Sequence, residues 1–450
     1  MTSISSQRKQ GRQKKFTDAN GWIFVMVFFL FLFFQDVNHR LLAQIKYESS
    51  GLFFTDLFGF FLEIPWHTLI YMVFLIIWGY LFDRYQRKKL FGVAGFIWGV
   101  TSLLMGIAPT YGIFLISNAA CGIDDACLPG IYSLVGDYFK PINRGKILGL
   151  LLITQPLGLF FSILFLPYLQ EVLGWQNLLF ILAGIGFLFV PVAFFSIKGA
   201  IRGRKEPILY EKNFEGLYLF DWQLAKSFLM DGSMILIYLI GFFSYIPWYL
   251  LPSWSSNLLR SPVVNPDIST TIAIYVLPSI VAMTLGFLTA GILGDHFIRK
   301  NKAGRVLVSL AGLILALISL IIIYHLRLNQ GPVLIVAMIV GGFSMVFPWP
   351  NLYALIMDIT LPEIRGTASA IFLFFQSLGG ILSPIFVSIF KNKIGLIGST
   401  VWTSISAWGI SIILLVVLLF RIPKDDEKLR KHLAYRSHIE TQVRKQTFNQ

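Results

Sequence analysis

The chain contains 450 residues, of which 56% are hydrophobic and only 13% are charged, and its mean hydropathy is +0.71. Soluble globular domains carry about one quarter charged residues, so this composition excludes that class. Apolar runs of about 18 residues or more, each long enough to cross a lipid bilayer, recur along almost the whole chain. The sequence therefore predicts an all-α membrane protein that crosses the bilayer many times.

In chain order, twelve transmembrane helices are predicted. Their expected spans are 18–44, 61–82, 90–108, 111–138, 146–169, 176–197, 231–255, 268–294, 305–325, 331–358, 366–390 and 398–421. The first span follows a basic tail, as a signal peptide would. It runs directly into QDVNHR without a small-residue cleavage site, so we expect it to stay as the first helix.

The longest polar stretch between spans divides the chain into six helices plus six. We therefore expect a basic tail at 1–17, a six-helix bundle at 18–197, a central loop at 198–230, a second six-helix bundle at 231–421 and a second basic tail at 422–450.

Positive charge is distributed unevenly between the two sides of these helices. Of the 37 Lys and Arg residues, 31 lie in the two tails, in the loops that follow the even-numbered helices or at the helix ends that adjoin them. Because Lys and Arg collect on the cytoplasmic side, both tails are predicted to be cytoplasmic, and we expect the protein in the cell membrane. The net charge of +14 is explained by this topology and does not indicate nucleic-acid binding. The basic C-terminal tail can also contact anionic membrane lipid.

Two sequence patterns occur once in each half. The segment after the second helix reads GYLFDRYQRKK and that after the eighth reads GILGDHFIRKNK, and both place Asp four residues after Gly and Arg four residues after Asp. The fourth and tenth helices end in DYFKPINRG and DITLPEIRG, which share Asp, Pro, Arg and Gly at one spacing. Duplicated six-helix halves with a binding site between them are a common transporter plan.

From these patterns we expect a cytoplasmic gate that closes in one state of the transporter. Asp83 is expected to cap the positive N-terminus of the eleventh helix, and each Arg to lie between carboxylates. The alternative is that these charges only enforce topology. The predicted gate residues are Gly79, Asp83, Arg84, Arg87, Asp137, Arg144, Asp295, Arg299, Asp358 and Arg365.

The G-x-x-x-D-R-x-x-R-K segment resembles the signature loop of the major facilitator superfamily, with Gln86 where that superfamily usually has Gly. The resemblance covers nearly the whole chain. It implies two pseudo-symmetric six-helix bundles that rock about a central cavity and expose it to each side in turn.

Within that superfamily, three stretches are similar to the Spinster family of lysolipid and sphingolipid transporters. They read GYLFDRYQRKKLFGVAGFIWGVTS, GIDDAC and RGTASAIFLFFQSLGGILSP. Asp125 stands where that family has Glu, and Cys127 where it has Ser. The resemblance implies a substrate that is an amphipathic anion or zwitterion.

Adjacent carboxylates lie within the predicted fourth helix. A step of about 100° per residue places Asn118, Gly122, Asp125 and Pro129 on one stripe. We therefore expect Asp125 in the central cavity and Asp124 at a helix contact, because ionisable groups within membranes usually serve function. The alternative is that Asp125 is a neutral, hydrogen-bonded packing residue. Asn118 stands where many superfamily members have Arg, which weakens the case for proton coupling.

The first helix supplies the expected partner of Asp125. Asp36 and Arg40 can pair at i, i+4, and we expect the Arg40 guanidinium within about 8 Å of the Asp125 carboxylate, directly or through water. His39 stands where the Spinster pattern has Asp, and an imidazole there is expected to make transport depend on pH. The alternative is that QDVNHR lies at the wet outer interface.

Further polar residues are weaker candidates. Glu63 and His67 form an i, i+4 pair near the outer end of the second helix, where an outer salt bridge explains them as well as a proton site does. Each remaining cavity candidate is a packing or interface residue in the alternative interpretation. The cavity candidates are Asp36, His39, Arg40, Asn118, Asp125, Gln155, Tyr245, Trp248, Trp349, Asn351 and Gln376.

No cofactor or metal site is predicted. Cys121 and Cys127 are too far apart on one helix for a disulfide, and no nucleotide-binding G-x-x-x-x-G-K-S/T loop occurs. We therefore expect a secondary transporter, working as a monomer, for a small-molecule or lipid substrate such as a lysolipid. The alternatives are a proton-coupled transporter of small organic anions such as sugar acids, and a transport-inactive sensor or scaffold. No nucleophile–base or metal pattern indicates an enzyme.

Overall fold

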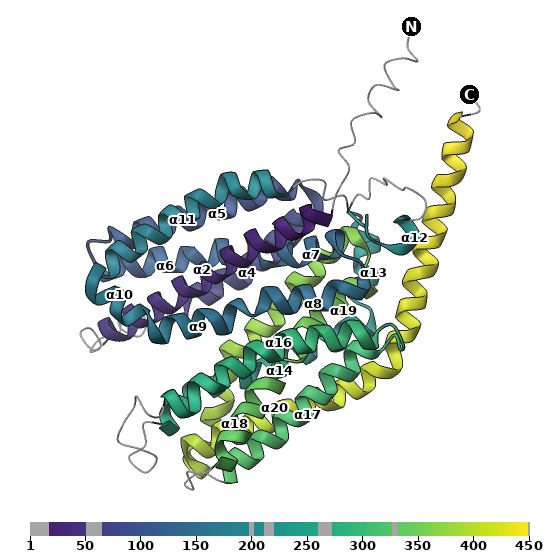
Figure 1. Cartoon of the computed structure of the whole chain (residues 1–450). Coiled ribbons are helices and arrows are strands. Elements are labelled where there is room, and N and C mark those ends of the chain that lie inside the picture. Colours follow the sequence, from purple (N-terminus) through teal and green to yellow (C-terminus); the bar gives the residue numbers. More distant parts are fainter. Residues whose placement is uncertain are drawn as a thin grey trace.

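The computed structural model describes residues 18–50, 65–197, 202–210, 220–259, 272–325 and 332–448. These residues are nearly all helical, and the helices pack into two bundles that lie side by side (Figure 1). Ten helices in the described part of the chain are long and apolar enough to cross a membrane. The protein therefore has the all-α, two-bundle architecture that the hydropathy pattern predicts.

The first bundle is made from the N-terminal half of the chain. Its helices are α2 (Asp18–Ser50), α4 (Trp66–Arg84), α5 (Arg87–Gly106), α6 (Tyr111–Asp125), α7 (Leu128–Tyr138), α8 (Pro141–Leu152), α9 (Thr154–Leu164), α10 (Leu166–Leu173) and α11 (Trp175–Ser196). Along the chain, the two halves are separated by the short helices α12 (Pro207–Tyr210) and α13 (Trp222–Leu229).

The second bundle is made from the C-terminal half. Its helices are α14 (Gly232–Leu259), η1 (Ile272–Val276), α16 (Leu277–Phe297), α17 (Gly304–His325), α18 (Pro332–Met345), α19 (Pro348–Ile359), η2 (Pro362–Ile364) and α20 (Arg365–Phe448). α20 contains the last two predicted spans, which meet at Gly395, a residue with non-helical backbone and a φ of 74°.

All twelve predicted spans are helical over most of their described residues. The parts 61–64, 268–271 and 331 lie outside the described residues. The predicted C-terminal tail continues α20 as a helix as far as Phe448, and it projects beyond the bundles (Figure 1). Leu429 and Leu433 are buried against the bundle, and Arg436 pairs with Glu363 at 2.6 Å.

The predicted fourth and tenth helices are each broken once. α6 ends at Asp125 and α7 begins at Leu128, and the break between α18 and α19 falls in the equivalent place before Pro348. Proline disfavours helical backbone in the residue before it and has no N–H to donate. Asp125 lies twelve residues before Asp137, and the residue at the same distance before Asp358 is Val346. The breaks are therefore symmetric, but the charge is not.

Glycines bring the two bundles into close contact. A methyl group at Gly79 of α4 would lie 2.5 Å from Ala370 Cβ and 3.0 Å from the Gly366 carbonyl oxygen of α20. In the other half, a methyl group at Gly291 of α16 would lie 2.2 Å from the Gly145 carbonyl oxygen of α8. The repeated Gly of the two sequence patterns thus lets one helix of each half approach the other half at backbone distance.

Candidate functional site

A cavity of about 300 Å³ lies between the two halves. Polar and aromatic side chains from both bundles line it together with leucines, and α4 contributes residues from its beginning. At 1.5 Å per residue, His67 is about 24 Å along α4 from Asp83, so the cavity is remote from the end at which α4 stops. Its wall is formed by Leu32, Gln35, Asp36, His39, Pro65, His67, Thr68, Tyr71, Asp125, Leu128, Tyr132, Leu151, Leu152, Thr154, Gln155, Tyr245, Tyr249, Leu373, Gln376, Ser377, Gly380 and Ile381.

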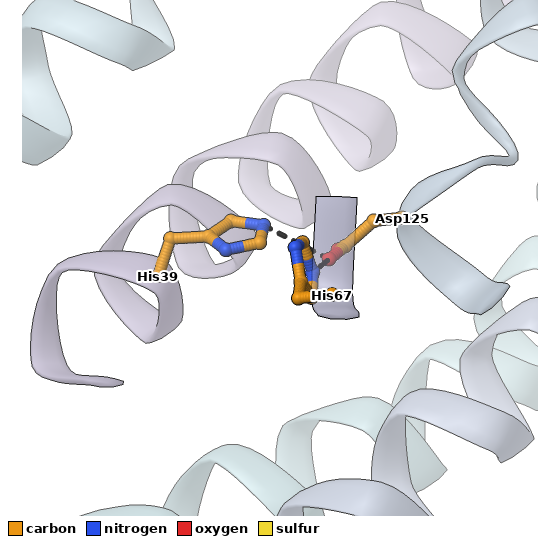
Figure 2. Close-up of side chains that lie close together, drawn as sticks. All are labelled: His39, His67 and Asp125. Carbon is orange, nitrogen blue, oxygen red and sulfur yellow. Dashed lines mark hydrogen bonds and ion pairs between the residues drawn. The ribbon is translucent and has the colours of Figure 1, made fainter. Parts of the chain in front are cut away.

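Asp125 receives three polar side chains from two other helices. Gln35 Nε2 donates to Asp125 Oδ1 at 2.9 Å. The Nε2 atoms of His39 and His67 lie 3.0 Å and 2.7 Å from Asp125 Oδ2. Figure 2 shows the two imidazoles converging on this one carboxylate from α2 and α4. Asp125 itself is only 5% exposed, so these contacts replace most of its hydration.

Gly122 allows α4 and α6 to approach at this point. A methyl group on Gly122 would lie 2.5 Å from the His67 carbonyl oxygen and 2.9 Å from the Tyr71 nitrogen. Because both neighbours are backbone atoms, any side chain there would push the helices apart. The Gly of the GIDD motif is therefore what brings His67 to Asp125.

Asp124 points away from the cavity, toward Cys121. It is fully buried, and neither of its carboxylate oxygens has a hydrogen-bond partner among the described residues. Asn38 of α2 also approaches this side of α6, with its Nδ2 3.8 Å from Cys121 Sγ. Asp124 is thus held at the contact between α6 and its neighbours.

The expected pairing of Asp125 with Arg40 is replaced by pairing with His39. Arg40 Nε instead bonds Asp36 Oδ2 at 3.3 Å within α2. Successive helical residues point about 100° apart, so His39 and Arg40 cannot both face α6. Gly158 of α9 leaves the room for Asp36, since a methyl group there would lie 2.1 Å from its Oδ2.

The remaining cavity candidates divide into two groups. Gln155, Tyr245 and Gln376 line the cavity together with Asp36, His39 and Asp125. Trp248 and Trp349 are not part of the wall. Trp349 packs edge-to-face against Tyr245 and against Trp248, with ring centroids 5.9 and 6.1 Å apart. Asn118 is buried in α6 without lining the cavity.

Asn351 has a structural position instead. Its Nδ2 donates to the carbonyl oxygens of Phe347, at the break before α19, and Ala290 of α16. It therefore stabilises the α18–α19 break against a neighbouring helix and does not line the cavity.

At the end where α4 stops, each half binds a helix N-terminus of the other. Asp83 accepts hydrogen bonds from the Gly366 and Thr367 N–H groups at the start of α20, at 2.9 and 2.6 Å. In the equivalent contact of the other half, Asp295 accepts hydrogen bonds from the Gly145 and Lys146 N–H groups near the start of α8, at 2.9 and 2.8 Å. A carboxylate is stabilised at a helix N-terminus by the free N–H groups and the helix dipole.

An arginine in each half binds the Asp residue in the last turn of α7 or α19. Arg87 binds Asp137 in the first half. In the second half Arg305 binds two carboxylates, 3.0 Å from Asp295 and 2.8 Å from Asp358.

Arg299 and Arg84 do not join this arrangement, although the sequence pattern selected both. Arg299 is exposed. Arg84 is also exposed and hydrogen-bonds Tyr80 of its own helix. The segment before α17 is longer than that before α5, so the first arginine of the helix, Arg305, occupies the place of Arg87.

Glu206, in the segment before α12, binds both halves at once. It contacts Arg144 of α8 at 2.5 Å and also pairs with Arg365 of α20. Burial opposes ionisation of Glu206, but the Arg144 and Arg365 guanidiniums outweigh it and lower its pKa from 4.5 to about 2. The central segment is therefore an ionic bridge across the interface, which the sequence analysis did not include.

We call the whole arrangement the closing network. It consists of Asp83, Arg87, Asp137, Arg144, Glu206, Asp295, Arg305, Asp358 and Arg365.

Comparison with known families agrees with this architecture. The family described as Major Facilitator Superfamily matches residues 58–384 and 269–445. The chain belongs to the major facilitator superfamily. As a member of that superfamily, it is an integral, multi-pass membrane transporter that binds small-molecule substrates.

Several relatives align with most of this chain. The Escherichia coli (strain K12) protein named "Probable galactarate/D-glucarate transporter GudP" is 22% identical over 440 residues, covering 88% of this chain and 92% of that protein. Protein spinster homolog 1 of Xenopus laevis is 22% identical over 345 residues, covering 72% of this chain and 64% of that protein.

Solved structures of superfamily transporters share the fold. The human organic anion transporter MFSD10 (TETRAN) matches with a TM-score of 0.67 at 14% identity, covering 87% of this chain and 99% of that one. The Escherichia coli fucose:proton symporter FucP matches with a TM-score of 0.65 at 16% identity, covering 88% and 97%.

Proposed function

We propose that this superfamily transporter moves small hydroxylated organic anions of the sugar-acid class through the cavity between its halves. The observation that carries this proposal is the size and polarity of the cavity. Its volume of about 300 Å³ lies at the lower end of ligand pockets. A sugar acid needs a compact site with many hydrogen-bonding groups, which matches this wall.

The hydrogen-bonding groups are distributed over both halves. Gln155 belongs to the first half, and Gln376 and Tyr245 to the second. Tyr353 donates to Gln376 Oε1 at 2.8 Å, which fixes the amide and leaves its Nε2 to serve the cavity. A ligand that bonds both halves at once stabilises the closing of the bundles around it, as alternating access requires.

Arg40 is the proposed partner of the anionic group. Arg40 is not itself part of the cavity wall, but its guanidinium lies 3.3 Å from the carboxylate of Asp36, which is. A carboxylate of the substrate would bind Arg40 in place of Asp36. Transport, not catalysis, is the activity that we assign to these residues.

A lysolipid is the second candidate, favoured by the Spinster-like stretches in the predicted second, fourth and eleventh helices. The leucines of the cavity wall, among them Leu128, Leu151 and Leu373, suit an acyl chain. However, a lysolipid carries that chain in addition to its head group and needs a larger or laterally open cavity. The sugar-acid class therefore becomes the first proposal.

For orientation, we propose that the end carrying the closing network faces the cytoplasm of the cell and that the cavity faces outward. Most Lys and Arg residues lie at that end, as the positive-inside rule requires. We further infer that the protein works as a monomer, because both halves of one chain complete the cavity.

Purified protein in liposomes tests the substrate assignment. We expect saturable uptake of labelled D-glucarate. The uptake rate should fall at least about tenfold in Gln155→Ala, which removes one neutral hydrogen-bonding side chain from the wall. Ser388→Ala, outside the cavity wall, serves as the control. Transport of a labelled lysolipid with no uptake of D-glucarate would overturn the sugar-acid proposal in favour of the second candidate.

A further inference from the structure

Three metal-binding side chains converge on one wall of the cavity. One ring nitrogen each of His39 and His67 and a carboxylate oxygen of Asp125 all lie within 4.8 Å of one another (Figure 2). We propose that His39, His67 and Asp125 bind a divalent transition-metal ion of the zinc class. This inference goes beyond the proposed function and does not depend on which substrate the protein carries.

The separations between the donor atoms fit such an ion. Zinc lies about 2.0–2.2 Å from nitrogen and oxygen ligands in tetrahedral sites, which sets neighbouring ligand atoms about 3.3 Å apart. The two histidine Nε2 atoms lie 3.0 and 2.7 Å from Asp125 Oδ2. Binding therefore requires the carboxylate to move away from each imidazole by a few tenths of an ångström, and the two imidazole nitrogens, which lie within 4.8 Å of each other, to reach a similar separation.

The protein already holds the carboxylate in the orientation that a metal ligand needs. Gln35 bonds Asp125 Oδ1 at 2.9 Å and leaves Oδ2 to the two imidazoles. Second contacts of this kind orient ligands and strengthen metal binding. On the other side, Gly122 allows the backbone approach that brings His67 within reach.

The chemistry of the donors defines the class of ion. Imidazole nitrogen suits zinc and its neighbours in the first transition row, whereas calcium and magnesium prefer sites made of oxygen. Three protein ligands leave a fourth position of the tetrahedron open. All three residues line the cavity, so water or a ligand oxygen in the cavity can occupy that position.

A neighbouring group of Cys121, Asp124 and Asp125 also brings three donor atoms within 4.8 Å. Neither Cys121 nor Asp124 lines the cavity, and both are fully buried. Only Asp125 of that group faces the cavity, whereas all three members of the two-histidine site do, so the two-histidine site is the one we assign.

All three ligands belong to α2, α4 and α6 of the first half. An ion bound to them would join helices within one bundle but would not link the two bundles. It is therefore compatible with rocking of the halves, and the site is expected to persist in both conformations of the transporter.

Cobalt(II) provides a direct probe, because it takes zinc sites and absorbs visible light strongly when it is tetrahedral. The full chain, purified in detergent and stripped with a chelator, is titrated with Co²⁺ and then with Zn²⁺. We expect one equivalent of Co²⁺, a tetrahedral absorption spectrum and its loss on addition of Zn²⁺. His39→Gln and His67→Gln should each weaken binding at least about tenfold.

The exposed His296 at the end of α16 offers a matched control, and His296→Gln should bind Co²⁺ as the wild type does. Size-exclusion profiles and melting temperatures measured without metal show whether each variant folds. If His67→Gln does not fold, Co²⁺ binding by His39→Gln alone tests the proposal. Failure of the wild type to bind Co²⁺, or undiminished binding in folded His39→Gln, would overturn the proposal.

Discussion

Asp83 binds Thr367 twice across the interface between the halves, through the backbone N–H at 2.6 Å and the hydroxyl at 2.8 Å. Asp83 ends α4, and Thr367 lies in the first turn of α20. These bonds exist only while the ends of the two bundles are together. They therefore contribute stability to one conformation of the transporter and not to the other.

The first prediction concerns this contact. Asp83→Asn removes the charge but keeps every Lys and Arg, so topology should not change. Hydrogen bonds to charged groups contribute about 1.5–3 kcal/mol, and we expect the closed state to lose about 2 kcal/mol, or about thirtyfold in its equilibrium. Spin labels at exposed Tyr85 and Lys300, at the ends of α4 and α16, should report a longer distance.

Glu427→Gln provides the control for that measurement, because exposed Glu427 pairs within its own helix, with Lys431. The labels require a background in which Cys121 and Cys127 are replaced by alanine. An identical distance distribution in wild type and Asp83→Asn would mean that the motif is a topology signal alone.

The second prediction concerns Glu206 and pH. Its pKa is lowered to about 2 in the folded protein, so its contribution is fully present above about pH 4.5 and is lost as the pH falls toward 2. Breaking a buried ion pair costs about 3 kcal/mol or more, so Glu206→Gln should melt at a lower temperature than wild type at pH 7. This difference should be unchanged at pH 5.5 and should shrink by pH 3.5. A difference that disappears already at pH 5.5 would contradict the ionic bridge.

The third prediction concerns the approach of α4 to α6. Gly122→Ala places a methyl group 2.5 Å from the His67 carbonyl oxygen and should cost about 1–3 kcal/mol through overpacking. It should also move His67 from Asp125 and reduce transport strongly. Gly112→Ala in the same helix has open space around it and should behave as wild type. Equal transport by the two variants would show that this contact is not required.

The fourth prediction concerns recognition of the anion. Arg40→Gln should raise the KM for D-glucarate about tenfold, since a hydrogen bond to a charged group is lost, while the maximal rate changes less. Arg84→Gln, which removes an exposed arginine outside the closing network, should leave both constants unchanged. A KM that stays constant in Arg40→Gln would move the anion site elsewhere in the cavity.

The fifth prediction concerns Asp125, the carboxylate at the helix break. Asp125→Asn keeps the volume of the side chain but removes the charge that both imidazoles approach, so we expect transport to be abolished. The protein should still reach the membrane and fold, as judged by its yield and size-exclusion profile. Wild-type transport by folded Asp125→Asn would return Asp125 to the role of a packing residue.

Hydropathy was sufficient to predict the helices, because each must supply a bilayer-length apolar surface. The contact of Asp83 with α20 was also predictable, because a carboxylate at the end of one helix is stabilised by the free N–H groups at the start of another. These inferences need only local chemistry and the repeat between halves.

The partner of Asp125 was not predictable in the same way. Choosing between His39 and Arg40 requires the rotation of α2 about its axis, which a single polar stretch does not fix. His67 requires the depth at which α4 packs on α6, set by Gly122. Arg305 was missed because the pattern selected an arginine by its spacing from Asp295. In the structure, the arginine that binds the carboxylates is instead the one in the first turn of the next helix. That first-turn position was the available signal.

Val346 occupies in the second half the place that Asp125 occupies in the first, at an otherwise equivalent break. The broken helix is thus present in both halves, whereas the carboxylate at the break is present only in the first. Substitutions in the second half's wall can retune which cargo is accepted without disturbing the charged centre. Changes of selectivity among relatives of this transporter should therefore be found mainly in α14 and α20.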